Sequence, residues 1–162
     1  MQANEPATVT GPDLQLDQRG TFRYQHLRLF KVYDATLFAP TQATDHEILS
    51  AQCPFELRLR YLRNIDRATI LKYANRILEE TLDPEERSAI AKRIGALHAV
   101  YPDMKRDDVA SLSYDPLNGT SFSLNQKKKI TIPGKDFAEY YLRIWLGAQP
   151  ASNEMRKSLL GD

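Results

Sequence analysis

The chain has 162 residues, and its 22 lysines and arginines against 21 aspartates and glutamates leave a formal net charge of +1. This balance argues against a nucleic-acid binder, whose surface is usually strongly basic. Cys53 is the one cysteine, which excludes an intramolecular disulfide, and no apolar run approaches the ~20 residues of a membrane-spanning helix.

The first part of the sequence is expected to consist mostly of strands. Residues 1–13 are polar and are predicted to form a lead-in to a single domain over residues 14–162. Strand-favouring residues run from 14 to 38, with a turn predicted at 17–20. In residues 55–62, apolar side chains alternate with charged ones, which predicts a strand with one apolar face and one wet face.

Helical spacing then replaces the alternation of the strands. Asp66 is expected to cap a first helix, and Asp83, followed by Pro84, is expected to cap a second one that ends at Pro102. An aspartate suits both starts because its carboxylate accepts hydrogen bonds from the free N–H groups of the first helical turn.

The last third returns to strands and then to helices. Strands are predicted at residues 109–114, 120–124 and 127–132, the first two joined by a tight Asn-Gly turn. An amphipathic helix is expected over residues 135–146, and Ser152 is expected to cap a last short one. The order of strands, two helices, strands and two helices predicts an α+β fold, an antiparallel sheet with helices packed on one face.

No sequence pattern for a cofactor or a metal is present. The chain lacks the glycine-rich loops that bind nucleotide phosphates, and its three histidines show no metal-ligating spacing. We therefore expect neither a cofactor nor a metal site.

Short sequence blocks spread over residues 14–161 form an ordered set. They are 31–38, 61–65, 101–108, 114–120, 124–125, 136–138, 144–147, 150 and 159–161. The set resembles the bacterial chalcone isomerase-like family, which implies an open-faced β-sandwich: a large antiparallel sheet, a layer of helices on one face, and a ligand cleft between them. Asp107 and Gln126 depart from the family, which usually has glycine at these two turn positions.

The resemblance implies two alternative functions, of which the first is catalytic. Plant enzymes of this fold close a chalcone to a flavanone and use a Tyr-x-x-Lys-x-x-x-Asn pattern on the first helix after the middle strand. Here Thr69 stands where the tyrosine would be, Lys72 is present, and Asn75 follows it by three residues instead of four. Because residues three and four apart point in different directions on a helix, the set is broken. Thr69 and Lys72 stay the catalytic candidates of an isomerase (intramolecular lyase).

The second function is the binding of fatty acids without catalysis. In that branch of the fold an arginine and a tyrosine near the sheet hold the carboxylate. Arg23 lies about where the family places its arginine, Tyr33 is the second donor, and Thr36 lies nearby in the sequence. A guanidinium offers two parallel donors to a carboxylate. We therefore predict a non-catalytic binder of a small apolar or amphipathic ligand, such as a fatty acid, held by Arg23, Tyr33 and Thr36.

The start of the chain bears on the cellular compartment. Residues 1–7 are polar and lack the basic and apolar regions of a signal peptide. Many bacterial relatives carry an export signal, so the resemblance implies a periplasmic or secreted protein in which Met1 replaces a removed signal peptide. A cytoplasmic location is the alternative.

Overall fold

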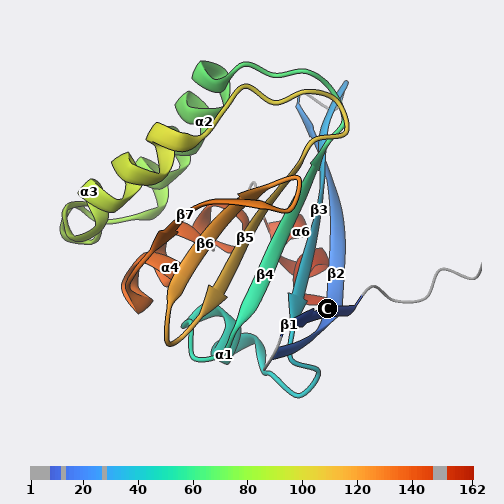
Figure 1. Cartoon of the computed structure of the whole chain (residues 1–162), viewed down its shortest axis with the longest axis vertical. Helices are drawn as coiled ribbons and strands as arrows, with labels where there is room; N and C mark the ends of the chain where they lie inside the picture. The colour runs from blue at the N-terminus through green and yellow to red at the C-terminus, as the bar shows by residue number, and fades with distance from the viewer. Residues whose placement is uncertain (1–7, 12–13, 27–28, 148–152) are drawn as a thin grey trace, which may run out of the picture.

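The computed structural model describes residues 8–11, 14–26, 29–147 and 153–162, which form a sheet with attached helices (Figure 1). The seven strands pair antiparallel in chain order: β1 (Thr8–Gly11), β2 (Leu14–His26), β3 (Phe30–Ala39), β4 (Phe55–Tyr61), β5 (Val109–Asp115), β6 (Gly119–Leu124) and β7 (Lys127–Ile132). The helices are α1 (Asp45–Leu49), α2 (Arg67–Thr81), α3 (Pro84–Val100), α4 (Lys135–Tyr141), α5 (Arg143–Leu146) and α6 (Asn153–Leu160). The predicted α+β, open-faced β-sandwich is confirmed.

Side-chain alternation on the central strands decides what each face of the sheet carries. On β4, Leu57, Leu59 and Tyr61 are buried against the helix layer. Arg58 and Arg60, between them in the sequence, lie on the opposite face because successive side chains of a strand point to opposite sides. The strand predicted at residues 55–62, with one apolar and one wet face, is therefore confirmed.

The helices cover the apolar face of the sheet. In Figure 1, α4 and α6 lie behind the sheet, and contacts join α6 to β2 and β3 and α4 to β6. Helix α5 contacts both α2 and α6, so the layer is continuous. None of the helices in the described ranges is long and apolar enough to cross a membrane.

Both predicted helix starts are confirmed. The Asp66 carboxylate accepts the backbone N–H of Thr69 at 2.7 Å, and Asp83 forms a reciprocal capping box with Glu86. These bonds satisfy N–H groups that have no partner within the helix. Because Asp66 fixes the start of α2 soon after β4 ends, the first turn of α2 lies at one end of the sheet.

The turn predicted at residues 17–20 is wrong. Strand β2 runs through this segment with a β-bulge between Gln18 and Gly20. The glycine is explained by a close approach of α6, because a Cβ on Gly20 would lie 1.9 Å from the carbonyl oxygen of Ser158. Gly20, which the sequence suggests as part of a turn, is therefore a close packing contact between β2 and α6.

Other local expectations differ in smaller ways. The helix predicted over residues 135–146 is divided into α4 and α5 at Leu142. Strand β1 lies inside the predicted polar lead-in, whose other residues, like Ser152, lie outside the described ranges. The turn positions Asp107 and Gln126 both have positive φ, 73° and 70°, the conformation that the family's glycines adopt without strain.

We expect Gly20→Ala to lower the free energy of unfolding by about 1–3 kcal/mol, because the added methyl overlaps the α6 backbone. Gly95→Ala, on α3, is the matched control. No atom lies within 4 Å of a Cβ built on Gly95. That variant should gain about 1 kcal/mol from helix propensity. Urea unfolding followed by circular dichroism measures both, and equal effects of the two substitutions would contradict the close contact of β2 with α6.

Candidate functional site

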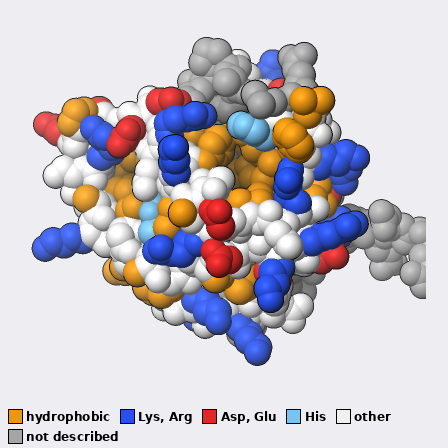
Figure 2. Space-filling model, turned by 90° about the horizontal axis from the view of Figure 1, so that it is seen from above, with side chains coloured by type: hydrophobic (Ala, Val, Ile, Leu, Met, Phe, Trp, Pro, Cys, Tyr) orange, Lys and Arg blue, Asp and Glu red, His pale blue; other side chains and the backbone are white. Residues whose placement is uncertain are grey.

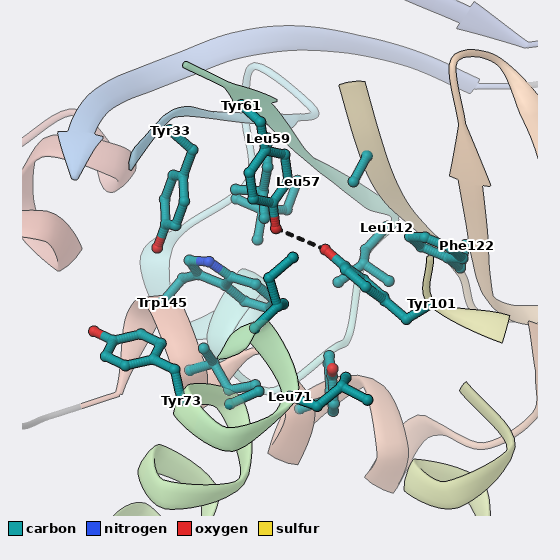
Figure 3. Close-up of a pocket in the computed structure, with 15 residues that line it drawn as sticks. Tyr33, Leu57, Leu59, Tyr61, Leu71, Tyr73, Tyr101, Leu112, Phe122 and Trp145 are labelled. Atoms are coloured by element: carbon teal, nitrogen blue, oxygen red, sulfur yellow. Dashed lines mark hydrogen bonds between the residues drawn. The ribbon is translucent and has the colours of Figure 1, made fainter. Parts of the chain in front are cut away.

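An apolar cleft runs between the helix-facing side of the sheet and helices α2 and α5. Its inner compartment has a volume of about 50 Å³. Figure 3 shows aliphatic side chains of β4 on one wall and the ring of Trp145, from α5, on another. Tyr61 and Tyr101 approach each other across the compartment, as Figure 3 shows. No charged side chain lines this compartment among the described residues.

The cleft continues into a wider mouth of about 380 Å³. Tyr33, Tyr61, Ile70 and Tyr73 line both compartments, so the two adjoin each other. Figure 2 looks onto this end of the molecule and shows a hollow with hydrophobic side chains inside it and lysine and arginine side chains around it. The mouth therefore combines an apolar interior with a polar rim.

Strand register explains the aromatic wall of the mouth. Tyr24 lies opposite Tyr33, and Tyr33 lies opposite Tyr61, so three neighbouring strands place a tyrosine in one row on the helix-facing side. The rings of Tyr24 and Tyr33 stack with their centroids 5.2 Å apart, and Tyr33 meets Tyr61 edge-on at 6.0 Å. Tyr73 of α2 closes the row at 5.6 Å from Tyr24. These rings give the wall of the mouth large, rigid apolar surfaces.

A buried pair of hydroxyls is the main polar feature of the inner compartment. The Tyr61 and Tyr101 oxygens are 2.8 Å apart. Burial raises the pKa of Tyr61 to about 12 and the pKa of Tyr101 well above its usual value, so both phenols are neutral at physiological pH. Because the pair needs only one of its two protons for the mutual bond, the other can be donated to a polar group of a bound molecule.

A second polar contact fixes the position of Tyr141, the part of the wall of the inner compartment that α4 contributes. His98, at the end of α3, lies with its Nε2 3.0 Å from the hydroxyl of Tyr141, which lines the inner compartment. Burial, with a smaller contribution from Arg67, lowers the pKa of His98 to about 4. The imidazole is therefore neutral at physiological pH, and the cleft gains no cation from it.

The sequence-predicted catalytic candidates are separated by the helix geometry. Thr69 lines the mouth, and its backbone N–H bonds the Asp66 cap. Lys72 is exposed on α2 and is not among the residues that line either compartment. The structure thus places one of the two at the cleft.

The predicted ligand-binding residues lie on two faces of the sheet. Tyr33 lies in the cleft, whereas Arg23 and Thr36 lie on the open face, where they line a separate hollow of about 650 Å³. Arg23 is bonded to both oxygens of Asp34, at 2.7 and 3.0 Å, and this pair lowers the pKa of the Asp34 carboxyl. The structure therefore does not bring the three residues together at one site, and the predicted binding by all three together is untested.

Arg63 is a site residue that the sequence reasoning missed. It lies two residues after the end of β4, lines the mouth, and places its guanidinium 5.0 Å from the ring centroid of Phe30. Among the described residues it has no carboxylate partner. The sequence contained a signal for Arg63. A charged residue that directly follows the predicted strand at residues 55–62 must lie at an end of the sheet, where a cleft beside the sheet opens.

The described residues offer no metal centre. No group of three or more histidine, cysteine, aspartate or glutamate side chains is placed to hold an ion in the ranges that the structure describes. The chemistry of the cleft is therefore that of apolar walls, neutral phenols and a cation at the rim.

We expect His98 to make stability depend on pH. An unfolded chain protonates this histidine near pH 6.5, whereas the folded protein does so only near pH 4. Stability is therefore lost as the pH falls, by about 1–2 kcal/mol between about pH 7 and about pH 5. In His98→Gln, whose amide can still bond Tyr141, this part of the loss should vanish.

Urea unfolding at the two pH values measures this effect, with His46→Gln, at an exposed position of α1, as the control. A His98→Gln protein that loses as much stability as the wild type on acidification would contradict a neutral, buried imidazole.

Three comparisons place the chain among known proteins. The sequence profile of the chalcone isomerase-like family matches residues 1–161. A search of curated proteins found no match. The crystal structure of a fatty-acid binding protein of Arabidopsis thaliana is similar to this structure, with a TM-score of 0.69 and 13% sequence identity over 96% of each chain. That likeness shows the fold, and the profile match shows the family: this chain belongs to the chalcone isomerase-like family.

Proposed function

We propose that this protein binds a small apolar carboxylate, such as a fatty acid, in the cleft between sheet and helices and does not transform it. The observation that carries the proposal is the combination of two adjoining apolar compartments with an arginine at the outer one. An amphipathic molecule has the same division into an apolar body and a charged end, so its two parts match the two parts of the cleft.

The two ends of such a ligand have distinct places in the cleft. The methyl end of the apolar tail enters the inner compartment between the leucines of β4 and Trp145, and the rest of the tail lies along the tyrosine rings of the wider mouth. The carboxylate stays at the mouth, where Arg63 offers two parallel N–H donors and has no competing carboxylate among the described residues. Keeping the charge at the rim avoids the high cost of burying an unpaired carboxylate.

The comparison with known structures supports the same assignment. The similar structure from Arabidopsis thaliana is named a fatty-acid binding protein, and it covers 96% of this chain. That name describes the Arabidopsis protein. The apolar cleft is the reason for proposing the same kind of ligand for the present chain.

We expect Arg63→Ala to weaken the binding of a fatty acid by about tenfold or more, because a hydrogen bond to a charged group contributes about 1.5–3 kcal/mol. Arg23→Ala is the matched control and should bind like the wild type, since Arg23 lies on the other face of the sheet and is engaged by Asp34. Titration calorimetry with a medium-chain fatty acid measures both variants.

The methyl ester of the same fatty acid separates headgroup from tail. It should bind the wild type and Arg63→Ala equally, because it lacks the carboxylate that Arg63 recognises. A larger loss in Arg23→Ala than in Arg63→Ala would place the headgroup on the open face and contradict the proposal. Failure of the wild type to bind any fatty acid would do so as well.

The catalytic alternative rests on Thr69, which lines the mouth. An isomerase that closes a chalcone must hold a phenolate and stabilise an enolate, which calls for a cation and polar donors at the reacting atoms. The inner compartment offers the Tyr61 and Tyr101 hydroxyls, whose raised pKa values keep them neutral, while Lys72 lies outside the cleft. We expect no conversion of a chalcone above its spontaneous rate, measured by the loss of its absorbance, and a clear rate that Thr69→Val abolishes would favour the isomerase.

A further inference from the structure

We propose that the rim of the cleft docks on an anionic lipid surface, so that the mouth opens toward a bilayer. The proposal begins from the start of β3, where Phe30 is 46% exposed and Leu29, the residue before it, is 77% exposed. Soluble proteins rarely expose large apolar side chains side by side without a reason. This inference goes beyond ligand binding and does not depend on which ligand the cleft takes.

The exposed pair is part of the rim of the mouth. Phe30 and His26 both line the mouth, and the backbone N–H of Leu29 donates to the carbonyl of His26 at 3.1 Å. Leu29 itself lines neither compartment and points its surface to solvent. Leu29 and Phe30 therefore offer an apolar contact directly beside the opening of the cleft.

Cations accompany this apolar contact. Arg63 lies over the Phe30 ring, and Lys31 is exposed on the other side of β3 at the same end of the sheet. Neither has an ion-pair partner among the described residues, and the two cations outnumber the one carboxylate of the mouth, Asp66, which caps α2. Apolar side chains flanked by unpaired cations are the combination that binds the boundary of an anionic bilayer.

The size of the patch favours a lipid surface over a protein partner. A stable protein interface buries about 800 Å² on each side. Three large hydrophobic side chains are exposed among the described residues, and two of them, Leu29 and Phe30, are here. Two adjacent side chains are too few for such an interface, but they suffice to enter the headgroup region when cations hold the protein at the surface.

The test is sedimentation of the full chain with lipid vesicles. Vesicles of equal parts phosphatidylglycerol and phosphatidylcholine should bind the wild type, and pure phosphatidylcholine or high salt should weaken the binding strongly. Leu29→Ser should reduce the affinity by about tenfold, because it removes one leucine from an apolar environment. Leu117→Ser is the matched control: Leu117 is 94% exposed on the turn between β5 and β6, at the opposite end of the sheet.

A second pair of variants tests the charge. Lys31→Glu should weaken binding to the anionic vesicles by about fivefold or more, since one cation near such a surface contributes about 1 kcal/mol. Lys92→Glu, an exposed position on α3, changes the net charge equally and should have little effect.

Three outcomes would overturn the proposal. The first is a wild type that binds neither kind of vesicle. The second is an equal loss of vesicle binding in Leu29→Ser and Leu117→Ser. The third is a concentration-dependent dimer in sedimentation analysis that Leu29→Ser abolishes, because the patch would then join two copies of the chain. Fatty-acid titration of Leu29→Ser in solution, expected to match the wild type, separates failure of this proposal from failure of ligand binding.

Discussion

Two neighbouring side chains on a strand cannot face the same side of a sheet, and the apolar character of the cleft depends on this constraint. The pairing of β2, β3 and β4 places Tyr24, Tyr33 and Tyr61 in one row on the helix-facing side. The adjacent row, which includes Arg23 and Asp34, must then lie on the open face. A shift of one residue in either pairing would exchange the two rows and fill the cleft with charges.

The inner compartment stays largely apolar because its buried hydroxyls bond other groups of the protein. Tyr61 bonds Tyr101, and Tyr141 bonds a histidine whose lowered pKa keeps it neutral. Buried hydroxyls without partners would each cost free energy and would attract water. With these bonds made inside the protein, the walls present mainly carbon to a ligand, and the charge needed for a headgroup stays at the rim with Arg63.

The sequence predicted what depends on local rules. The alternation at residues 55–62 and the caps at Asp66 and Asp83 are each decided within a few residues, and the structure confirms them. The sequence could not predict the site in full. The face on which Arg23 lies depends on the register of β2 with β3, and the role of Gly20 depends on its contact with α6. The family resemblance gave the fold and the idea of a cleft, but it did not give the face of each residue.

The central claim is that the space between sheet and helices, and not the open face, receives the ligand. A crystal structure of the protein with a fatty acid brominated at its methyl end tests this claim most directly, because the anomalous signal of bromine locates the tail. The account predicts a bromine peak in the inner compartment, near Leu59 and Trp145. A peak beside Arg23 on the open face, or an empty cleft in crystals of a protein that binds the acid in solution, would contradict it.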